Sequence, residues 1–173
     1  MKHISTRQLA LCAVLTALAL GLSTLENLFP VTLLIPLPGV KLGLANIVTV
    51  FALYQLGALP ALAILTARCL LGGLFAGNAS AMLFSLLGGL TAMLVMILLR
   101  RLRCLSIYGV SIGGAAGHNL GQMAAALITL GNTAVLSYLP FLLGISLLTG
   151  TLTGFVSSLL FRAMAHIKLS TKE

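Results

Sequence analysis

Acidic residues are almost absent from this chain of 173 residues. It contains no aspartate, and its two glutamates are Glu26 and the C-terminal Glu173. A paired-carboxylate site for magnesium therefore has no residues to form it. The three cysteines, Cys12, Cys69 and Cys104, are scattered without C-x-x-C spacing. This pattern excludes a disulfide framework and a zinc site built from cysteines.

Several catalytic motifs are also missing. The sequence has no G-x-x-x-x-G-K-[ST] phosphate loop, no H-E-x-x-H zinc motif and no G-x-S-x-G turn. Hydrolysis of ATP by the phosphate-loop route would have to come from another chain. We therefore expect a protein that is not an enzyme and that carries no metal or cofactor.

Charge is scarce as well. Only 7% of the residues are charged, whereas a soluble domain carries about 25%. The chain is 60% hydrophobic, and its mean hydropathy is +1.16. A soluble fold of this size could not bury so much apolar surface, so the surrounding solvent must be lipid. The net charge of +8 is explained by anionic headgroups rather than by nucleic acid.

Six apolar segments are separated by helix-breaking residues, and each predicts a helix. Their ranges are 7–25, 41–56, 58–76, 79–99, 107–130 and 135–165. Three prolines in the loop after the first segment prevent a continuous helix there. The last segment exceeds the roughly 20 residues that a spanning helix needs, so we expect it to begin with an interfacial turn. The fold class is an all-α integral membrane protein, a six-transmembrane-helix bundle in a single membrane domain over residues 1–173.

The start of the chain resembles a signal peptide, because basic residues precede an apolar run. No small-x-small cleavage site follows before a polar sequence, so a retained spanning helix is favoured. Basic residues form three clusters, at the N-terminus, after the fourth segment and in the C-terminal tail: Lys2 and Arg7; Arg100, Arg101 and Arg103; Arg162, Lys168 and Lys172. An even number of crossings places all three on one side, which the positive-inside rule makes cytoplasmic. We expect a multi-pass cell-membrane protein with both termini in the cytoplasm.

Two basic residues, Arg68 and Lys41, lie outside these clusters. Arg68 is in the middle of the third segment, where a charge costs roughly 2.5–3.5 kcal/mol and needs a partner. It either pairs structurally with Glu26 or presents its guanidinium to an anionic ligand, with Glu26 orienting it. Lys41 either snorkels to headgroups or faces the same ligand, and Asn46 and Asn78 add polar groups nearby. A net positive outer cavity favours an anionic or zwitterionic small molecule.

The fifth segment combines a glycine stripe with polar residues. Its glycines recur every four residues and lie on one helix face: Gly109, Gly113, Gly117 and Gly121. They predict close helix packing, or a smooth wall for a ligand. Three polar residues lie beside the stripe: His118, Asn119 and Gln122. They form either an inter-helix hydrogen-bond network or part of a ligand site; no second metal-ligating side chain is suitably spaced for His118.

The first segment carries a second stripe of small residues, Ala13, Ala17 and Gly21. One interpretation is packing inside the bundle. The other is docking of this helix onto another membrane subunit.

Together these features resemble substrate-binding S components of energy-coupling-factor (ECF) vitamin transporters. The basic start followed by Arg7-Gln-Leu-Ala-Leu-Cys-Ala13-Val-Leu-Thr-Ala17 and the Pro/Gly-rich outer loop carry this likeness. The segment Leu37-Pro-Gly-Val-Lys41-Leu-Gly-Leu-Ala-Asn46 and the glycine-rich fifth helix more narrowly resemble the Gx transporter family, also labelled heptaprenyl diphosphate synthase component I. The resemblance covers essentially the whole chain.

The resemblance implies a subunit that captures a small nutrient at the outer face. It also implies two kinds of partner, a transmembrane scaffold and two cytoplasmic ATPases, with Ala13 and Ala17 matching the family's docking stripe. It identifies no ligand residue, because such pockets differ with each substrate. Flavins, thiamine-like compounds, modified nucleobases and isoprenoid or quinone precursors all stay open.

The synthase label conflicts with the composition. Prenyl diphosphate synthases bind magnesium diphosphate through two Asp-rich motifs, and this chain has no aspartate. The alternative function is therefore a non-catalytic membrane subunit associated with heptaprenyl diphosphate or quinone biosynthesis. A structural subunit of a membrane redox complex is a third alternative, although no haem or cluster ligation pattern supports it.

Overall fold

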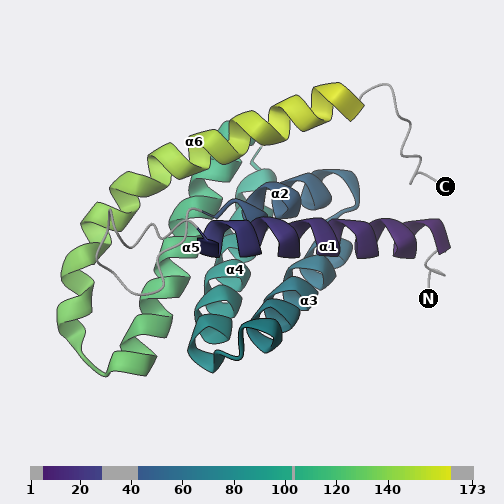
Figure 1. The fold of residues 1–173 in the computed structure, drawn as a ribbon. Coiled ribbons are helices and arrows are strands. Elements are labelled where there is room, and N and C mark those ends of the chain that lie inside the picture. Colours follow the sequence, from purple (N-terminus) through teal and green to yellow (C-terminus); the bar gives the residue numbers. More distant parts are fainter. Residues whose placement is uncertain (1–5, 29–42, 103, 165–173) are drawn as a thin grey trace.

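A computed structural model of the chain describes residues 6–28, 43–102 and 104–164. In these ranges the chain is all helical and contains no strand (Figure 1), as the apolar segments predict. The helices are α1 (Thr6–Leu28), α2 (Ala45–Gln55), α3 (Ala58–Ala76), α4 (Ala79–Arg100), α5 (Ile107–Leu130), the 3-10 helix η2 (Thr133–Tyr138) and α6 (Leu139–Met164).

The predicted breaks match the observed helix ends closely, because the residues at the breaks cap the helices. Gly77 and Gly131 adopt φ of 58° and 62° and end α3 and α5, a left-handed conformation that glycine adopts without steric cost. Asn78 and Ser106 then accept backbone hydrogen bonds as the N-caps of α4 and α5. The expected turn before the last helix is η2.

The start of the second helix was predicted four residues too early. Position 41 lies outside the described residues, and α2 begins at Ala45. Gly43 adopts φ of 82°, which no right-handed helix contains, so the helix cannot extend back through it. The backbone oxygen of Gly43 accepts the N–H of Asn46 at 2.8 Å and closes the turn before the helix.

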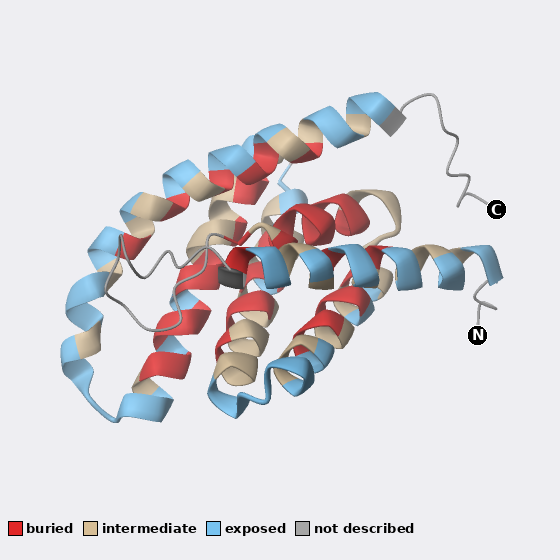
Figure 2. Cartoon of the chain, in the orientation of Figure 1, coloured by how far each residue is buried: buried red, intermediate tan, exposed pale blue. Residues whose placement is uncertain are grey.

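The short helix α2 is the centre of the bundle. Nine consecutive residues, from Ala45 to Leu53, are buried (Figure 2), and the helix contacts α1, α3, α4 and α6. A helix that is buried on every side is mostly apolar all round, and among the buried residues of α2 only Asn46 and Thr49 are polar. Eleven residues span about 16 Å, whereas the hydrocarbon core of a bilayer is about 30 Å thick. One end of α2 therefore lies inside the bundle.

The other end of α2 is held by the end of α4. Arg100 donates a hydrogen bond to the backbone oxygen of Leu53. Its guanidinium lies 4.8 Å from the ring centroid of Tyr54, a cation–π contact. Phe161 of α6 stacks on Phe51 at 5.4 Å. The basic cluster after the fourth segment thus also anchors the central helix.

Within the described residues, four stretches are long and apolar enough to cross a membrane: Thr6–Glu26, Ala58–Ala76, Ala79–Arg100 and Thr133–Ala163. α2 is too short, and α5 carries glycines and polar side chains that lower its hydropathy. Large apolar side chains cover the outside of the bundle; Leu74 and Phe75 of α3, for example, are 71% and 76% exposed. The described chain therefore has the pattern of a multi-pass membrane protein.

Glycines set the distance between α4, α5 and α6. A Cβ at Gly113 or Gly121 would collide with α4, and Thr91 of α4 donates a hydrogen bond to the backbone oxygen of Gly117 at 2.8 Å. Gly109 instead faces Leu105, outside the α4 interface.

A second small-residue face, on α6, was not identified in the sequence analysis: a Cβ at Gly150 would collide with the α5 backbone. Both interfaces bring helix backbones close together.

Candidate functional site

The start of α2 lies beside the middle of α3. The two helices run antiparallel across the tight turn at Gly57, so Asn46 at the beginning of α2 faces Arg68, halfway along α3. The first N–H groups of a helix have no partner within the helix and carry partial positive charge; in α2 those of Asn46 and Ile47 donate to the preceding backbone oxygens of Gly43 and Leu44. The structure therefore places a helix N-terminus and a guanidinium together in the interior of the bundle.

Arg68 is buried, with 7% of its surface exposed. Its Nη2 donates to Oδ1 of Asn46 at 3.4 Å, a long hydrogen bond. Its Nε finds no acceptor among the described residues. A buried cation with one long neutral contact retains capacity to bind an anion.

Glu26 of α1 is also buried and lies near the same helix start. Its Oε1 accepts the backbone N–H of Gly43 at 2.6 Å. The side chain thus fixes the turn that precedes α2, and the recorded partner of Arg68 in the described residues is Asn46. Glu26 and Arg68 therefore both contact the start of α2, Glu26 through the backbone N–H of Gly43 and Arg68 through the side chain of Asn46.

The polar residues of α5 are buried and face two neighbouring helices. Nδ2 of Asn119 donates to the backbone oxygen of Leu142 on α6 at 2.7 Å. On the other side, a Cβ at Gly88 of α4 would lie 2.8 Å from Cε1 of His118 and 3.1 Å from Cγ of Gln122. Gly88 therefore provides the space that these two side chains occupy. Asn119 joins α5 to α6, while His118 and Gln122 pack on α4.

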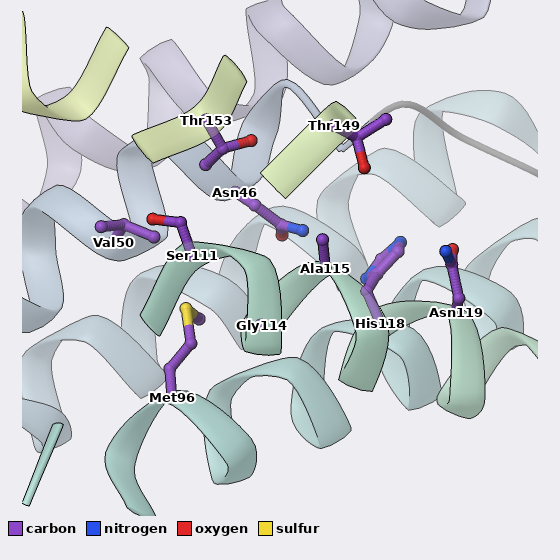
Figure 3. A pocket seen from close by; sticks show the side chains of 10 residues that line it. All are labelled: Asn46, Val50, Met96, Ser111, Gly114, Ala115, His118, Asn119, Thr149 and Thr153. Carbon is purple, nitrogen blue, oxygen red and sulfur yellow. The ribbon is translucent and has the colours of Figure 1, made fainter. Parts of the chain in front are cut away.

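A small cavity connects the start of α2 with this polar face of α5 (Figure 3). Side chains of α2, α4, α5 and α6 line it: Asn46, Val50, Met96, Ser111, Gly114, Ala115, His118, Asn119, Thr149 and Thr153. Its volume is about 10 Å³, enough for about one water molecule. It is a polar pocket of the size of a solvent molecule, not of a nutrient.

Three polar lining residues were missed by the sequence analysis: Ser111, Thr149 and Thr153. Ser111 precedes His118 by seven residues, or two helical turns, so it shares the polar face of α5. Oγ of Ser111 has no hydrogen-bond partner among the described residues. On α6 the buried Ser146, Thr153 and Ser157 follow a helical period that could have identified this face.

A larger groove lies on the other side of Arg68, with a volume of about 160 Å³. Residues of α1, α3 and α4 line it: Leu20, Ser23, Thr24, Arg68, Cys69, Gly72, Gly73, Phe75, Ala76, Ala81 and Ser85. No resemblance or motif pointed to this groove. Arg68 therefore lies between two hollows, since Asn46 joins it to the small cavity and its own side chain lines the large one.

The remaining candidates lie elsewhere. Asn78 is exposed and caps α4 through the N–H of Ala81 at 3.0 Å, and Lys41 lies outside the described residues. Ala13, Ala17 and Gly21 are exposed on the outer face of α1, away from the bundle. Within the described residues, no three His, Cys, Asp or Glu side chains gather into a metal site.

The family comparison agrees with the narrow resemblance seen in the sequence. The family model described as heptaprenyl diphosphate synthase component I matches residues 15–160. Comparison with curated proteins and with solved structures gives no match. The matched range includes α2 to α5 in full and most of α1 and α6, and with them Arg68, Asn46 and the polar face of α5. The chain belongs to the heptaprenyl diphosphate synthase component I family.

Proposed function

We propose that the chain is the substrate-binding membrane subunit, or S component, of an ECF-type importer. It captures a small anionic or zwitterionic group from the outer side, and partner ATPases power its release to the cytoplasm. The observation that carries this proposal is the buried Arg68 beside the start of α2. A helix that begins at mid-depth and turns its N-terminus toward a cavity is a recurrent way to bind anionic groups in membrane transporters.

The charges around Arg68 support an anionic ligand. Asn46 is a neutral partner, so it positions the guanidinium without cancelling its charge. Glu26 contacts the backbone at Gly43. A planar guanidinium binds carboxylate or phosphate through two parallel hydrogen bonds. Nε of Arg68, which has no acceptor among the described residues, is one of the required donors.

The outer face of α1 supports a membrane partner. Ala13, Ala17 and Gly21 are exposed, and a Cβ at Gly21 would meet no atom within 4 Å. Packing inside this bundle therefore does not account for the stripe. Small residues on a lipid-facing helix allow another helix to approach closely. A transmembrane scaffold that couples the chain to two cytoplasmic ATPases would use this face.

The proposal includes six membrane segments with both termini in the cytoplasm. α5 crosses the bilayer because its polar side chains face α4 and α6 rather than lipid. α2 reaches partway from the cytoplasmic side, where Arg100 holds its end. The basic clusters then lie on one side, as the positive-inside rule requires.

The family description favours a second candidate, a non-catalytic membrane subunit associated with heptaprenyl diphosphate or quinone biosynthesis. The absence of aspartate from the sequence excludes the magnesium–diphosphate chemistry of the catalytic step. In this role the chain would hold a soluble catalytic subunit at the membrane.

Purification of the tagged protein from its native membranes, with mass spectrometry of the co-purifying proteins, separates the two candidates. The importer predicts recovery of a transmembrane scaffold and two ATPases. Recovery of a prenyl synthase catalytic subunit without ATPases would establish the second candidate and contradict the first.

A further inference from the structure

The groove beside Arg68 has the features of a site for an amphiphile. It runs along the second half of α3, which contacts both α1 and α4. With about 160 Å³ it exceeds the central cavity of about 10 Å³ many times over. A ligand larger than water therefore has room on this side of Arg68 and not on the side of Asn46.

The inner part of the groove is cationic and polar. Arg68 lines it, is more than nine-tenths buried, and has an Nε without an acceptor in the described chain. Ser23 and Thr24 of α1 add hydroxyl groups. None of the described lining residues is acidic, so the charge of Arg68 is not cancelled within the groove. This end is complementary to a carboxylate or phosphate group.

The outer part of the groove is apolar and open. Phe75 lines it and is 76% exposed. Gly72 and Ala76 also line it and contribute no large side chain. These residues belong to α3, one of the helices long and apolar enough to cross a membrane. The groove is therefore open at the surface of the bundle near the end of α3, where the exposed side chain of Phe75 would contact lipid.

We propose that Arg68 recognises the anionic headgroup of an amphiphile that enters from the bilayer through the groove between α1 and α4. Its hydrocarbon chain lies along Gly72 and Phe75, and its headgroup contacts Nε of Arg68 while Asn46 holds Nη2. This inference rests on the proposed binding role of the chain, and it replaces a water-soluble ligand with a membrane-borne one. It also assigns Ser23, Thr24 and Gly72 to the site.

Tryptophan quenching tests the groove directly, because the chain contains no tryptophan of its own. Phe75→Trp places a single reporter in the groove. Leu148→Trp is the matched control, since Leu148 is 74% exposed on α6. Each full-length variant is reconstituted in phosphatidylcholine vesicles with a small fraction of phosphatidic acid that carries brominated chains, which quench tryptophan on contact. The expected result is stronger quenching of Phe75→Trp than of Leu148→Trp.

Two further substitutions identify the cause of that difference. Arg68→Met in the Phe75→Trp background removes the charge and is expected to weaken the apparent affinity for phosphatidic acid about tenfold or more. Gly72→Leu fills the groove while Arg68 stays, because a Cβ at Gly72 already lies 3.4 Å from Leu20, and it is expected to abolish the excess quenching. Gly144→Leu is its control, since a Cβ there meets no atom within 4 Å.

Three results would overturn the inference. The first is equal quenching of Phe75→Trp and Leu148→Trp, and the second is quenching of Phe75→Trp by brominated phosphatidylcholine that equals its quenching by brominated phosphatidic acid. The third is quenching of Phe75→Trp above that of Leu148→Trp that persists in both the Arg68→Met and the Gly72→Leu backgrounds. If any of these occurs while the scaffold and two ATPases co-purify, the groove assignment fails and the proposed function stands. If the quenching behaves as expected without those partners, the amphiphile site stands and the importer fails.

Discussion

Replacement of Arg68 by methionine should separate binding from stability. A charge at mid-depth costs roughly 2.5–3.5 kcal/mol. Against this, the guanidinium gains a 3.4 Å hydrogen bond to Asn46, and hydrogen bonds to charged groups contribute about 1.5–3 kcal/mol only at good geometry. Arg68 is therefore poorly compensated in the structure. Methionine is unbranched, similar in length and apolar, so Arg68→Met should keep the free energy of unfolding or raise it by about 1 kcal/mol.

The assay is reversible unfolding of the purified protein in bicelles, followed in parallel with the yield in the membrane. Arg162→Met is the matched control, because Arg162 is exposed at the end of α6 and should be close to neutral. Ligand binding should be lost in Arg68→Met and kept in Arg162→Met. A free energy of unfolding of Arg68→Met that is more than about 2 kcal/mol below that of wild type, or a failure of the variant to accumulate, would show that the charge is structural.

Three other variants test the docking face of α1, the α5–α6 contact and the turn before α2. Ala13→Leu with Ala17→Leu should prevent co-purification of the scaffold and leave ligand binding intact; unchanged co-purification would refute docking through α1. Gly150→Ala should destabilise the protein by about 1–3 kcal/mol through overpacking on α5, whereas Gly144→Ala should not, and equal unfolding of the two would contradict the close α5–α6 contact. Gly43→Ala should lower the free energy of unfolding by about 1–2 kcal/mol, because a Cβ disfavours φ of 82°. It should also weaken ligand binding, because Gly43 lies in the turn before α2. Binding equal to that of wild type would show that this turn does not position the site.

Helix positions follow from the sequence because the breaks are chemically explicit. Gly77 with Asn78, and Gly131 with Asn132, combine a left-handed C-cap with an asparagine N-cap. The periodicity of apolar residues could not show that α2 is central, because a short apolar run is equally typical of a lipid-facing segment. Its central position depends on contacts with four other helices.

The candidate site was predictable in part, and for a physical reason. Arg68 stands out because a charge within an apolar segment is costly, so it must be buried in protein or face water. Its hydrogen bond to Asn46 could not be predicted from the sequence, in which Glu26 is the obvious counter-charge. The groove could not be predicted at all, because Gly72 and Ser23 form it only when α1 and α3 pack together.

The exposed stripe on α1 shows the same limit. The spacing of Ala13, Ala17 and Gly21 indicates a close helix contact, but not whether the partner belongs to this chain. The structure turns these residues outward, while Leu15 and Ala19 of the same helix face the core.

The most direct test of the central claim is the identity of any compound that remains bound to the protein. Wild type and Arg68→Met are purified from native membranes in equal amounts, extracted, and compared by mass spectrometry. If Arg68 binds the ligand, the wild-type extract should contain an anionic compound that is missing from the Arg68→Met extract. The same compound in both extracts, at equal amounts, would contradict the assignment of Arg68 as the ligand-binding cation.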